Sequence, residues 1–198
     1  MKRLFDTLFS ASVLICGAPI YLFISLLIKF SSKGPIFYAC ERVGIGGRTI
    51  HCWKFRSMSV DAEQNLKELL KNPAYACEWQ TYRKLKNDPR ITTIGHFLRK
   101  SSLDELPQFW NVLKGDLSIV GPRPAKQEEI EHFFGAKKDK ILSVRPGITG
   151  LWQTSGRNQL SYEERVALEE QYVDLRSFFF DLKLILKTCR ILFSKGAY

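Results

Sequence analysis

Two adjacent acidic residues, Asp104 and Glu105, lie where residues capable of chemistry are densest in this chain. Arg99 comes shortly before them, and Arg123 follows within a Gly-Pro-Arg-Pro sequence. One carboxylate can act as a nucleophile while the other binds a metal ion or a proton. Arginine guanidinium groups bind phosphate oxygens through paired hydrogen bonds. This combination of residues predicts phosphoryl-transfer chemistry.

A purely structural interpretation of the two acids stays open. Ser102 and Glu105 match the spacing of a helix capping box, in which Glu105 would only satisfy backbone N–H groups. Pro107 disfavours this box, because inside such a helix it would remove a bond to the Leu103 carbonyl. A helix with Asp104 as its N-cap places Pro107 in the first turn, where no bond is lost and free N–H groups suit a phosphate. Capping and catalysis are compatible.

The composition fits one cytosolic domain whose partner carries negative charge. Of the 198 residues, 30 are Lys or Arg and 20 are Asp or Glu, which gives a net charge of +10. Nucleic acid, anionic lipid or a phosphorylated ligand would complement that charge. The five cysteines form no C-x-x-C pair, which disfavours zinc and redox motifs and predicts free thiols in a reducing compartment.

One long apolar run extends from Leu8 to Ile28 without a charged residue. As a helix rising about 1.5 Å per residue, it would cross a hydrocarbon core of about 30 Å. Pro19 interrupts this run and bends or breaks the helix. Basic residues flank it on both sides, at Lys2, Arg3, Lys29 and Lys33. Because basic flanks favour the cytoplasm, we expect a broken, re-entrant helix; a kinked span and a buried soluble helix are the alternatives.

The middle of the chain predicts a β-hairpin followed by a helix. The expected elements are a turn into a strand at 34–38, a glycine-rich turn at 43–48, a return strand at 49–55 and a helix at 61–70. The glycine-rich turn lacks the fingerprint of a nucleotide-binding loop. Asp61 is the expected cap of the helix, and the polar residues 72–90 contain a turn at 87–89.

Two arginines each stand next to proline. Pro122 and Pro124 flank Arg123, and Pro124 biases Arg123 towards an extended backbone, so that its side chain is displayed rigidly. Arg145 precedes Pro146 and repeats this arrangement. Both arginines suit phosphate binding, although two turns with solvated arginines would have the same sequence.

The C-terminal segment, from about residue 178 to 193, predicts a basic amphipathic helix. Its apolar residues recur at helical spacing at Leu182, Ile185, Leu186, Cys189 and Phe193. Its basic residues lie on a neighbouring face at Lys183, Lys187 and Arg190. Such a helix lies in a membrane interface, and the alternative is packing on the protein core.

Taken together, these residues resemble the monotopic phosphoglycosyl transferases, bacterial sugar transferases also known as polyprenyl-phosphate hexose-1-phosphate transferases. The resemblance covers nearly the whole chain. Its most specific part is the ordered run from Ser-Leu-Asp-Glu-Leu-Pro-Gln at 102–108 to Gly-Pro-Arg-Pro at 121–124. Further matching segments are residues 2–6, 54–58, 88–90, 98–99, 145–150 and 156–158.

The resemblance implies a helix-rich α/β monotopic membrane protein. A re-entrant helix at 1–33 would carry a cytosolic catalytic domain at 34–198, on the bacterial plasma membrane with the active site facing the cytoplasm. The implied reaction transfers a sugar-1-phosphate from a UDP-sugar to polyprenyl (undecaprenyl) phosphate and releases UMP, with Mg²⁺ as cofactor. It would be the first membrane step in making a polysaccharide or glycoconjugate.

The same resemblance implies a role for each site residue. Asp104 would be the nucleophile that forms a covalent phospho-sugar intermediate, and Glu105 would bind the metal. Phosphate binding would fall to three arginines, Arg99, Arg123 and Arg145. Arg157 and Asn158 would lie near the donor site.

Some details refine the resemblance. Residues 151–157 and 160–165 are similar to the branch that handles galactose or glucose phosphate. Ala18 and Pro19 stand where many relatives have Ser-Pro. The chain lacks the extra N-terminal membrane helices of larger relatives, so we expect the catalytic module alone.

Two other functions are compatible with parts of the pattern. The first is a lipid-phosphate phosphatase that uses an aspartyl-phosphate, although its usual D-x-D loop is missing. The second is a membrane-anchored protein that binds nucleic acid or anionic lipid, which explains the charge but gives the paired acids no purpose. The transferase interpretation predicts no nucleic-acid partner and allows a homo-oligomer.

Overall fold

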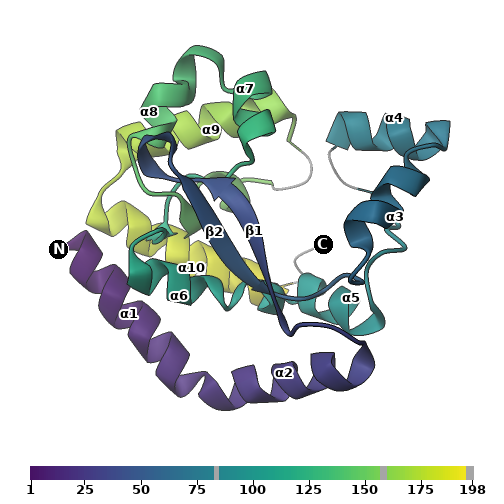
Figure 1. The fold of residues 1–198 in the computed structure, drawn as a ribbon. Helices are drawn as coiled ribbons and strands as arrows, with labels where there is room; N and C mark the ends of the chain where they lie inside the picture. The colour runs from purple at the N-terminus through teal and green to yellow at the C-terminus, as the bar shows by residue number, and fades with distance from the viewer. Residues whose placement is uncertain (83–84, 157–159, 195–198) are drawn as a thin grey trace.

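The N-terminal apolar segment forms two helices that meet at a bend. The computed structural model describes residues 1–82, 85–156 and 160–194. In it, α1 (Lys2–Cys16) and α2 (Ala18–Ser31) run along one edge of the molecule and are bent by 60° (Figure 1). Within the described residues no single helix is long and apolar enough to cross a bilayer, but the bent pair together has the necessary length and composition.

The chemistry of the bend explains its position. Pro19 lies in the first turn of α2, where its missing N–H costs no helical bond. Gly17 connects the helices, and its N–H donates to the Val13 carbonyl at 2.9 Å. A Cβ on Gly17 would lie 2.5 Å from that same oxygen, so a larger residue would force the end of α1 to shift. The helix therefore breaks beside Pro19, as the sequence predicts.

The inner face of α1 packs on the remainder of the protein. Asp6 is buried and accepts a hydrogen bond from Ser118 Oγ at 2.8 Å. Lys2 Nζ donates to the Val120 carbonyl at 3.1 Å and forms an ion pair with Asp181. Residues 1–33 are therefore bound to the domain by polar contacts as well as by apolar packing.

The predicted hairpin is present. Strand β1 (Phe37–Val43) pairs antiparallel with β2 (Thr49–Phe55), and the register places Cys40 opposite Cys52. The turn between them contains Gly46 and Gly47, both with positive φ, which explains why glycine is needed there. Cys16, Cys40, Cys52 and Cys189 are free thiols, as the sequence predicts.

The remaining elements surround the hairpin and a short parallel pair of strands, β3 (Ser118–Val120) and β4 (Gly147–Thr149). The helices are α3 (Ala62–Leu69), α4 (Pro73–Tyr82), α5 (Thr93–Lys100), α6 (Gln108–Lys114), α7 (Gln127–Phe133), α8 (Lys138–Leu142), α9 (Tyr162–Leu175) and α10 (Phe178–Ser194). Short 3₁₀ helices are η1 (Ile45–Gly47), η2 (Leu103–Glu105), η3 (Gly135–Lys137) and η4 (Trp152–Thr154). The architecture is mixed α/β and rich in helix, as expected.

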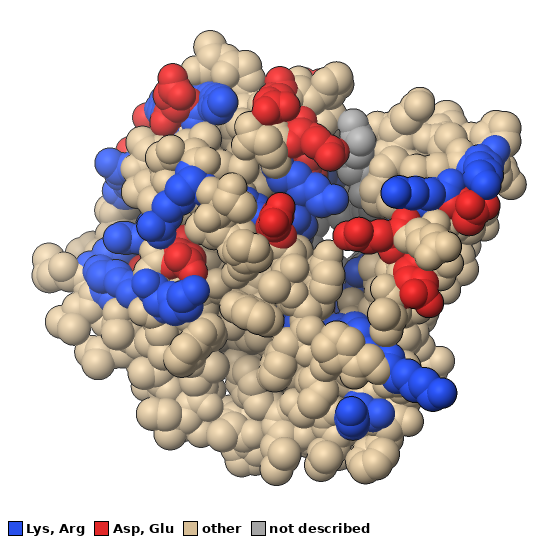
Figure 2. Space-filling model, in the orientation of Figure 1, with Lys and Arg blue, Asp and Glu red and all other residues tan. Residues whose placement is uncertain are grey.

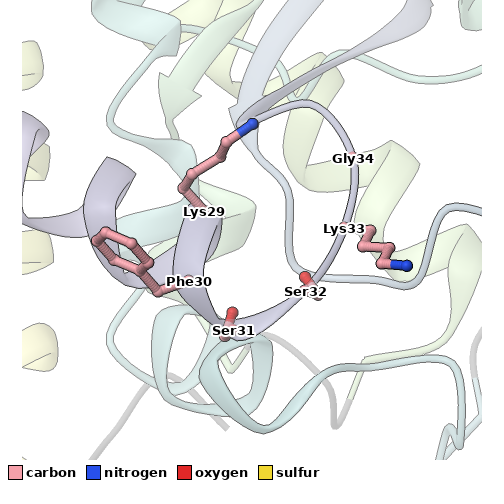
Figure 3. Close-up of a pocket in the computed structure, with 6 residues that line it drawn as sticks. All are labelled: Lys29, Phe30, Ser31, Ser32, Lys33 and Gly34. Carbon is pink, nitrogen blue, oxygen red and sulfur yellow. The ribbon is translucent and has the colours of Figure 1, made fainter.

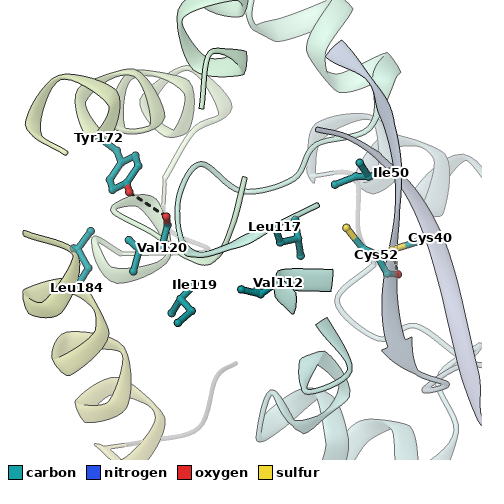
Figure 4. Close-up of a cluster of buried hydrophobic side chains, with 9 residues drawn as sticks. All are labelled: Cys40, Ile50, Cys52, Val112, Leu117, Ile119, Val120, Tyr172 and Leu184. Carbon is teal, nitrogen blue, oxygen red and sulfur yellow. Dashed lines mark hydrogen bonds between the residues drawn. The ribbon is translucent and has the colours of Figure 1, made fainter. Parts of the chain in front are cut away.

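The main apolar core joins the hairpin to the C-terminal helices. It consists of Cys40, Ile50, Cys52, Val112, Leu117, Ile119, Val120, Tyr172 and Leu184 (Figure 4). The Tyr172 hydroxyl, buried among these side chains, donates to the Val120 carbonyl at 3.0 Å. A second core joins α2 to the region of the paired acids, through Ile24, Ile28, Phe55 and Leu98.

Two local details differ from what the sequence analysis describes. The polar stretch 72–90 contains α4, which the sequence analysis did not predict, before the expected turn at 87–89. Asp61 stands at the start of α3 as expected, but its side chain makes no capping hydrogen bond.

The C-terminal helix packs on the protein core, and its position in a membrane interface stays a prediction. Leu184 of α10 is buried in the main core and Ile185 packs against it, so the helix packs on the protein. Phe179, Leu186 and Leu192 of the same helix are exposed apolar residues. One face of α10 therefore faces the core while another presents apolar side chains to the surroundings.

Candidate active site

The acidic pair lies in a tight turn that two apolar residues hold in place. Asp104 belongs to η2 and is 7% exposed. Leu103 and Leu106, on either side of the pair, pack into the core shared with α2. The Tyr21 hydroxyl of α2 donates to the Leu106 carbonyl at 2.7 Å. The bent helix pair therefore contacts the turn that presents the acids.

The turn differs from the predicted helix start. Ser102 has a φ of 57°, in the left-handed region, and its side chain makes no capping hydrogen bond. Helix α6 begins at Gln108 with Pro107 as its N-cap, and not at Asp104. Both capping interpretations were therefore wrong, because the chain forms a separate 3₁₀ turn before Pro107.

Among the described residues, Lys54 and Arg123 hold Glu105. Lys54 Nζ, at the end of β2, lies 2.6 Å from Glu105 Oε1. Arg123 Nη2 lies 3.8 Å from the same oxygen. The Lys54 and Glu105 side chains each retain only about a fifth of their exposure, so solvent screens this pair less than it screens a surface pair. This geometry favours an ionised Glu105.

The electrostatic environment of Asp104 combines opposing effects. Burial raises the pKa of its carboxyl group, and the neighbouring Glu105 raises it further. Lys54, Arg99 and Arg123 all lower it, with Lys54 the strongest of the three. The three cations therefore reduce the cost of burying an ionised carboxylate at this position.

Arg99 reaches the site from the last turn of α5. Its Nε donates to Ser57 Oγ at 2.9 Å, which orients the guanidinium group. Gly95 allows α5 to lie this close to the segment that follows β2, because a Cβ on Gly95 would be 1.9 Å from the Ser57 carbonyl oxygen. Strand β2 thus supplies Lys54 directly, and Ser57, just after the strand, positions Arg99.

Arg123 is positioned by α9 and η4. Its backbone N–H donates to Glu169 Oε1 at 2.9 Å, and its guanidinium carbon lies 5.3 Å from the Trp152 ring centroid. Its side chain keeps 44% of its exposure and extends to Glu105. The expected rigid display of this arginine between two prolines is therefore reinforced by contacts that the sequence analysis did not predict.

The other predicted site residues are Arg145, Arg157 and Asn158, and the structure does not place Arg145 beside the acids. Arg145 is exposed and its Nε donates to the Gly115 carbonyl at 3.0 Å, at the C-terminal end of α6, whereas the acids precede the N-terminal end. Its role in phosphate binding stays a prediction. Arg157 and Asn158 lie outside the described residues.

The sequence prediction missed Lys54, Glu169 and Trp152, and two of them carried a usable sequence signal. Every second residue of β2 lies on the same face, which carries Ile50, Cys52 and Lys54. Ile50 and Cys52 are buried, so Lys54 is a charged residue on a buried face. Val166, Glu169 and Tyr172 form the buried stripe of α9, which contains an acid. An ionisable residue within an apolar periodic stripe indicates a specific partner. Trp152 showed no comparable local pattern.

A cavity of about 460 Å³ lies away from these acids, at the end of α2. Six consecutive residues line it, Lys29, Phe30, Ser31, Ser32, Lys33 and Gly34 (Figure 3). Arg56 closes the helix end there by donating to the carbonyls of Ser32 and Lys33 at 2.8 and 2.7 Å. The lining contains no carboxylate, so the predicted nucleophile chemistry is not located in this cavity.

The carboxylate pair fits one kind of metal site. Within the described residues, no group of three or more His, Cys, Asp or Glu side chains could enclose a metal ion. Mg²⁺ commonly binds through one or two carboxylates, with substrate phosphates and water completing its coordination. Asp104 and Glu105 offer that donor set, so the fit is to a magnesium ion shared with a phosphorylated substrate.

Comparison with known proteins identifies the family. The family model for bacterial sugar transferases matches residues 1–195. The chain belongs to this family. Membership does not favour the phosphatase and nucleic-acid-binding alternatives, and it places the paired acids in a transferase.

Curated relatives share this match at substantial identity. The exopolysaccharide production protein ExoY of Sinorhizobium fredii is 47% identical over 199 residues, covering all of this chain and 88% of the relative. The undecaprenyl-phosphate galactose phosphotransferase of Salmonella typhimurium is 44% identical over 200 residues. The match covers all of this chain and 42% of the length of the relative. The UDP-glucose:undecaprenyl-phosphate glucose-1-phosphate transferase of Klebsiella pneumoniae is 38% identical, and the match covers all of this chain and 41% of the relative.

The ion pair between Lys54 and Glu105 generates a testable prediction. Lys54→Gln removes the closer of the two described cations from Glu105, and it removes the cation with the strongest effect on Asp104. A hydrogen bond to a charged group contributes about 1.5–3 kcal/mol, so kcat/KM for sugar-phosphate transfer should fall about 10- to 150-fold. Lys67→Gln, at an exposed position on α3, is the matched control and should retain full activity. Equal activity of the two variants would show that Lys54 serves only folding.

Proposed function

We propose that this protein transfers a sugar-1-phosphate from a UDP-sugar to polyprenyl (undecaprenyl) phosphate and releases UMP. The observation that carries the proposal is the buried Asp104 beside an ion-paired Glu105, with Lys54, Arg99 and Arg123 acting on Asp104 and with Lys54 and Arg123 also close to Glu105. A diphosphate donor and a phosphate acceptor are both anionic, so a site that joins them needs this excess of cations. The names of the Salmonella and Klebsiella relatives support the acceptor and the donor class.

The proposed mechanism has two steps. An oxygen of the Asp104 carboxylate attacks the phosphorus that carries the sugar, and the bond from this phosphorus to UMP breaks, with its electron pair leaving on UMP. A phosphate oxygen of the lipid then attacks the same phosphorus, and the bond to Asp104 breaks to restore the carboxylate. Because UMP can leave before the lipid reacts, the two anionic substrates need not occupy the site together.

Each neighbouring residue has a defined part in this mechanism. Arg123 extends towards Glu105 with an exposed guanidinium edge that can bind two phosphate oxygens. Arg99, oriented by Ser57, adds a second cation on Asp104. Lys54 favours the ionised forms of both acids. Glu105 is the residue that would hold Mg²⁺, which when bound neutralises charge on the phosphate oxygens.

We further propose that α1 and α2 form a re-entrant membrane element. The two helices expose the apolar side chains of Leu4, Leu8, Ile15, Ile20, Leu22, Phe23, Leu26 and Phe30. The surface where they lie is largely uncharged in Figure 2, whereas charged side chains gather above it. An exposed apolar patch of this kind is suited to lipid. Since basic residues flank both ends, the site would face the cytoplasm from the bacterial plasma membrane.

Release of UMP tests the proposed function directly. Purified protein in detergent, given undecaprenyl phosphate and a panel of UDP-hexoses, should release UMP and form a lipid-linked sugar with at least one donor. The names of the relatives place UDP-galactose and UDP-glucose first in the panel. An active galactose phosphotransferase from the same family serves as the positive control. Release of inorganic phosphate from the lipid, without UMP, would instead support a phosphatase.

Metal removal tests the role of Glu105. We expect EDTA to abolish turnover and added Mg²⁺ to restore it, because a donor diphosphate needs its charge neutralised. Glu105→Gln should abolish turnover while its thermal unfolding stays cooperative. Glu128→Gln, an exposed acid on α7, is the control and should behave like the unmodified protein. Full activity in EDTA, or in Glu105→Gln, would contradict the metal role.

Accessibility labelling tests the re-entrant proposal. Single cysteines at positions 2 and 33, in a variant with its native cysteines replaced, should react with a membrane-impermeant reagent only in inverted vesicles. The expected result follows from the bend beside Pro19 and the basic residues on both flanks. Labelling of either position from the periplasmic side of intact cells would show that the segment spans the membrane.

A further inference from the structure

The backbone of Arg123 is held by a single buried acid. Prolines have no N–H, so in the segment Pro122–Arg123–Pro124 the amide of Arg123 is the one backbone donor. This N–H donates to Glu169 Oε1 at 2.9 Å, and Glu169 is 4% exposed on the inner face of α9. A hydrogen bond to an ionised carboxylate is stronger than one to a neutral acceptor. Glu169 therefore fixes the point from which the Arg123 side chain starts.

The side chain of Arg123 is held separately. Its guanidinium carbon lies 5.3 Å from the centroid of the Trp152 ring, and Arg165 contacts the same ring at 5.0 Å. Trp152 is 9% exposed, so its ring is fixed by the surrounding protein. The ring restricts the plane of the guanidinium group. Glu169 thus fixes the backbone of Arg123, and Trp152 orients its guanidinium group, which extends to Glu105.

Stability alone does not explain the acid at position 169. Glu169 Oε2 is buried and has no hydrogen-bond partner among the described residues. A buried, half-satisfied carboxylate costs folding free energy that a neutral amide of the same shape would reduce. The retained charge has one favourable effect in the structure, which is its attraction for Arg123.

We propose that Glu169 and Trp152 are positioning residues that together orient the Arg123 guanidinium group towards the phosphate of the donor. Glu169 acts through the Arg123 amide and Trp152 through its ring. Neither residue is required to touch the substrate. The proposal rests on the proposed transferase function for the identity of the phosphate, but the geometry of Arg123 is a property of the protein alone.

The ionisation of Glu169 supplies a signature for this role. Burial raises the pKa of Glu169 to about 7, and the Arg123 amide and guanidinium oppose this rise. Other charged groups lie near Glu169 and Arg123. Arg165 lies one turn before Glu169 on α9, and Glu129 of α7 lies near Arg123. The residues of η4 have no titratable side chain. Lys140 of α8 bonds to other acids of α9, Glu170 and Asp174. Glu169 therefore gains its proton as the pH falls through about 7.

The direction of the two pH effects differs. Since the pKa of Glu169 in the folded protein lies above its usual value, the stability that the protonated acid contributes is lost as the pH rises through about 7. The same ionisation strengthens the attraction for Arg123 and should raise activity. Glu169→Gln should accordingly be at least as stable as the unmodified protein at pH 8.5, yet less active there. A residue with only a structural role would lose stability and activity together.

The decisive experiment compares Glu169→Gln with Glu170→Gln, the adjacent acid, which forms ion pairs with Lys137 and Lys140. We expect Glu169→Gln to lose at least tenfold in kcat/KM at pH 8.5 without a lower melting temperature, and to lose the inflection near pH 7. Trp152→Leu should lose activity similarly, and Trp152→Phe should recover most of it. Both losses should shrink in an Arg123→Lys background, because the guanidinium group is then absent.

A second measurement separates this proposal from the proposed function. The Nε–H signal of Arg123 in an NMR spectrum of arginine-labelled protein should shift in Glu169→Gln and in Trp152→Leu, whether or not UMP is released. If the unmodified protein releases no UMP but the signal shifts, the transferase proposal fails and the positioning role stands. An unchanged Arg123 signal, or kinetics of Glu169→Gln that match those of Glu170→Gln, would overturn the positioning role.

Discussion

The burial of the Asp104 carboxylate is the constraint on which the site depends. The turn that holds Asp104 is anchored by Leu103 and Leu106 in an apolar core, so the acid is withdrawn from water. An uncompensated buried charge costs several kcal/mol, and the chain offsets this cost with Lys54, Arg99 and Arg123. These cations come from three separate segments, and each is oriented by its own contacts. The fold around the site can be understood as the means of bringing these segments to one turn.

The same turn connects the chemistry to the bent helix pair. Ile24 and Ile28 of α2 share a core with Phe55 and Leu98, close to Lys54 and Arg99 in sequence. Tyr21 bonds directly to the carbonyl of Leu106. An acceptor confined to a membrane and a donor dissolved in the cytoplasm can meet only at the interface between the two. A catalytic turn that packs on a membrane-directed helix is a physical solution to that problem.

Much of this arrangement was predictable from the sequence because its signals are local. Alternating residues and paired glycines predicted the hairpin, and Pro19 between basic flanks predicted the bend. The paired acids and the proline-flanked Arg123 predicted the chemistry. The start of α6 was predicted wrongly, because the left-handed conformation of Ser102 allows a separate turn that no capping rule anticipates.

What the sequence analysis missed depends on distant contacts. Lys54 meets Glu105, and Glu169 meets Arg123, only through tertiary packing, and no local rule pairs them. The available signal was an ionisable residue within a buried stripe, which indicates a partner without identifying it. The proline beside Arg145 suggested the same role as for Arg123, but the structure places Arg145 at the other end of α6. An arginine beside proline therefore does not by itself predict where its side chain lies relative to the acids.

The most direct test of the account is the mass of the intact protein after incubation with a UDP-sugar alone. We expect the protein to gain the mass of one phospho-sugar, UMP to be released in at most equal amount, and the modified peptide to contain Asp104. Asp104→Asn should show no gain, because an amide is a poor nucleophile. An adduct on another residue, or full activity in Asp104→Asn, would contradict the central role of the buried carboxylate and indicate direct transfer between the two bound substrates.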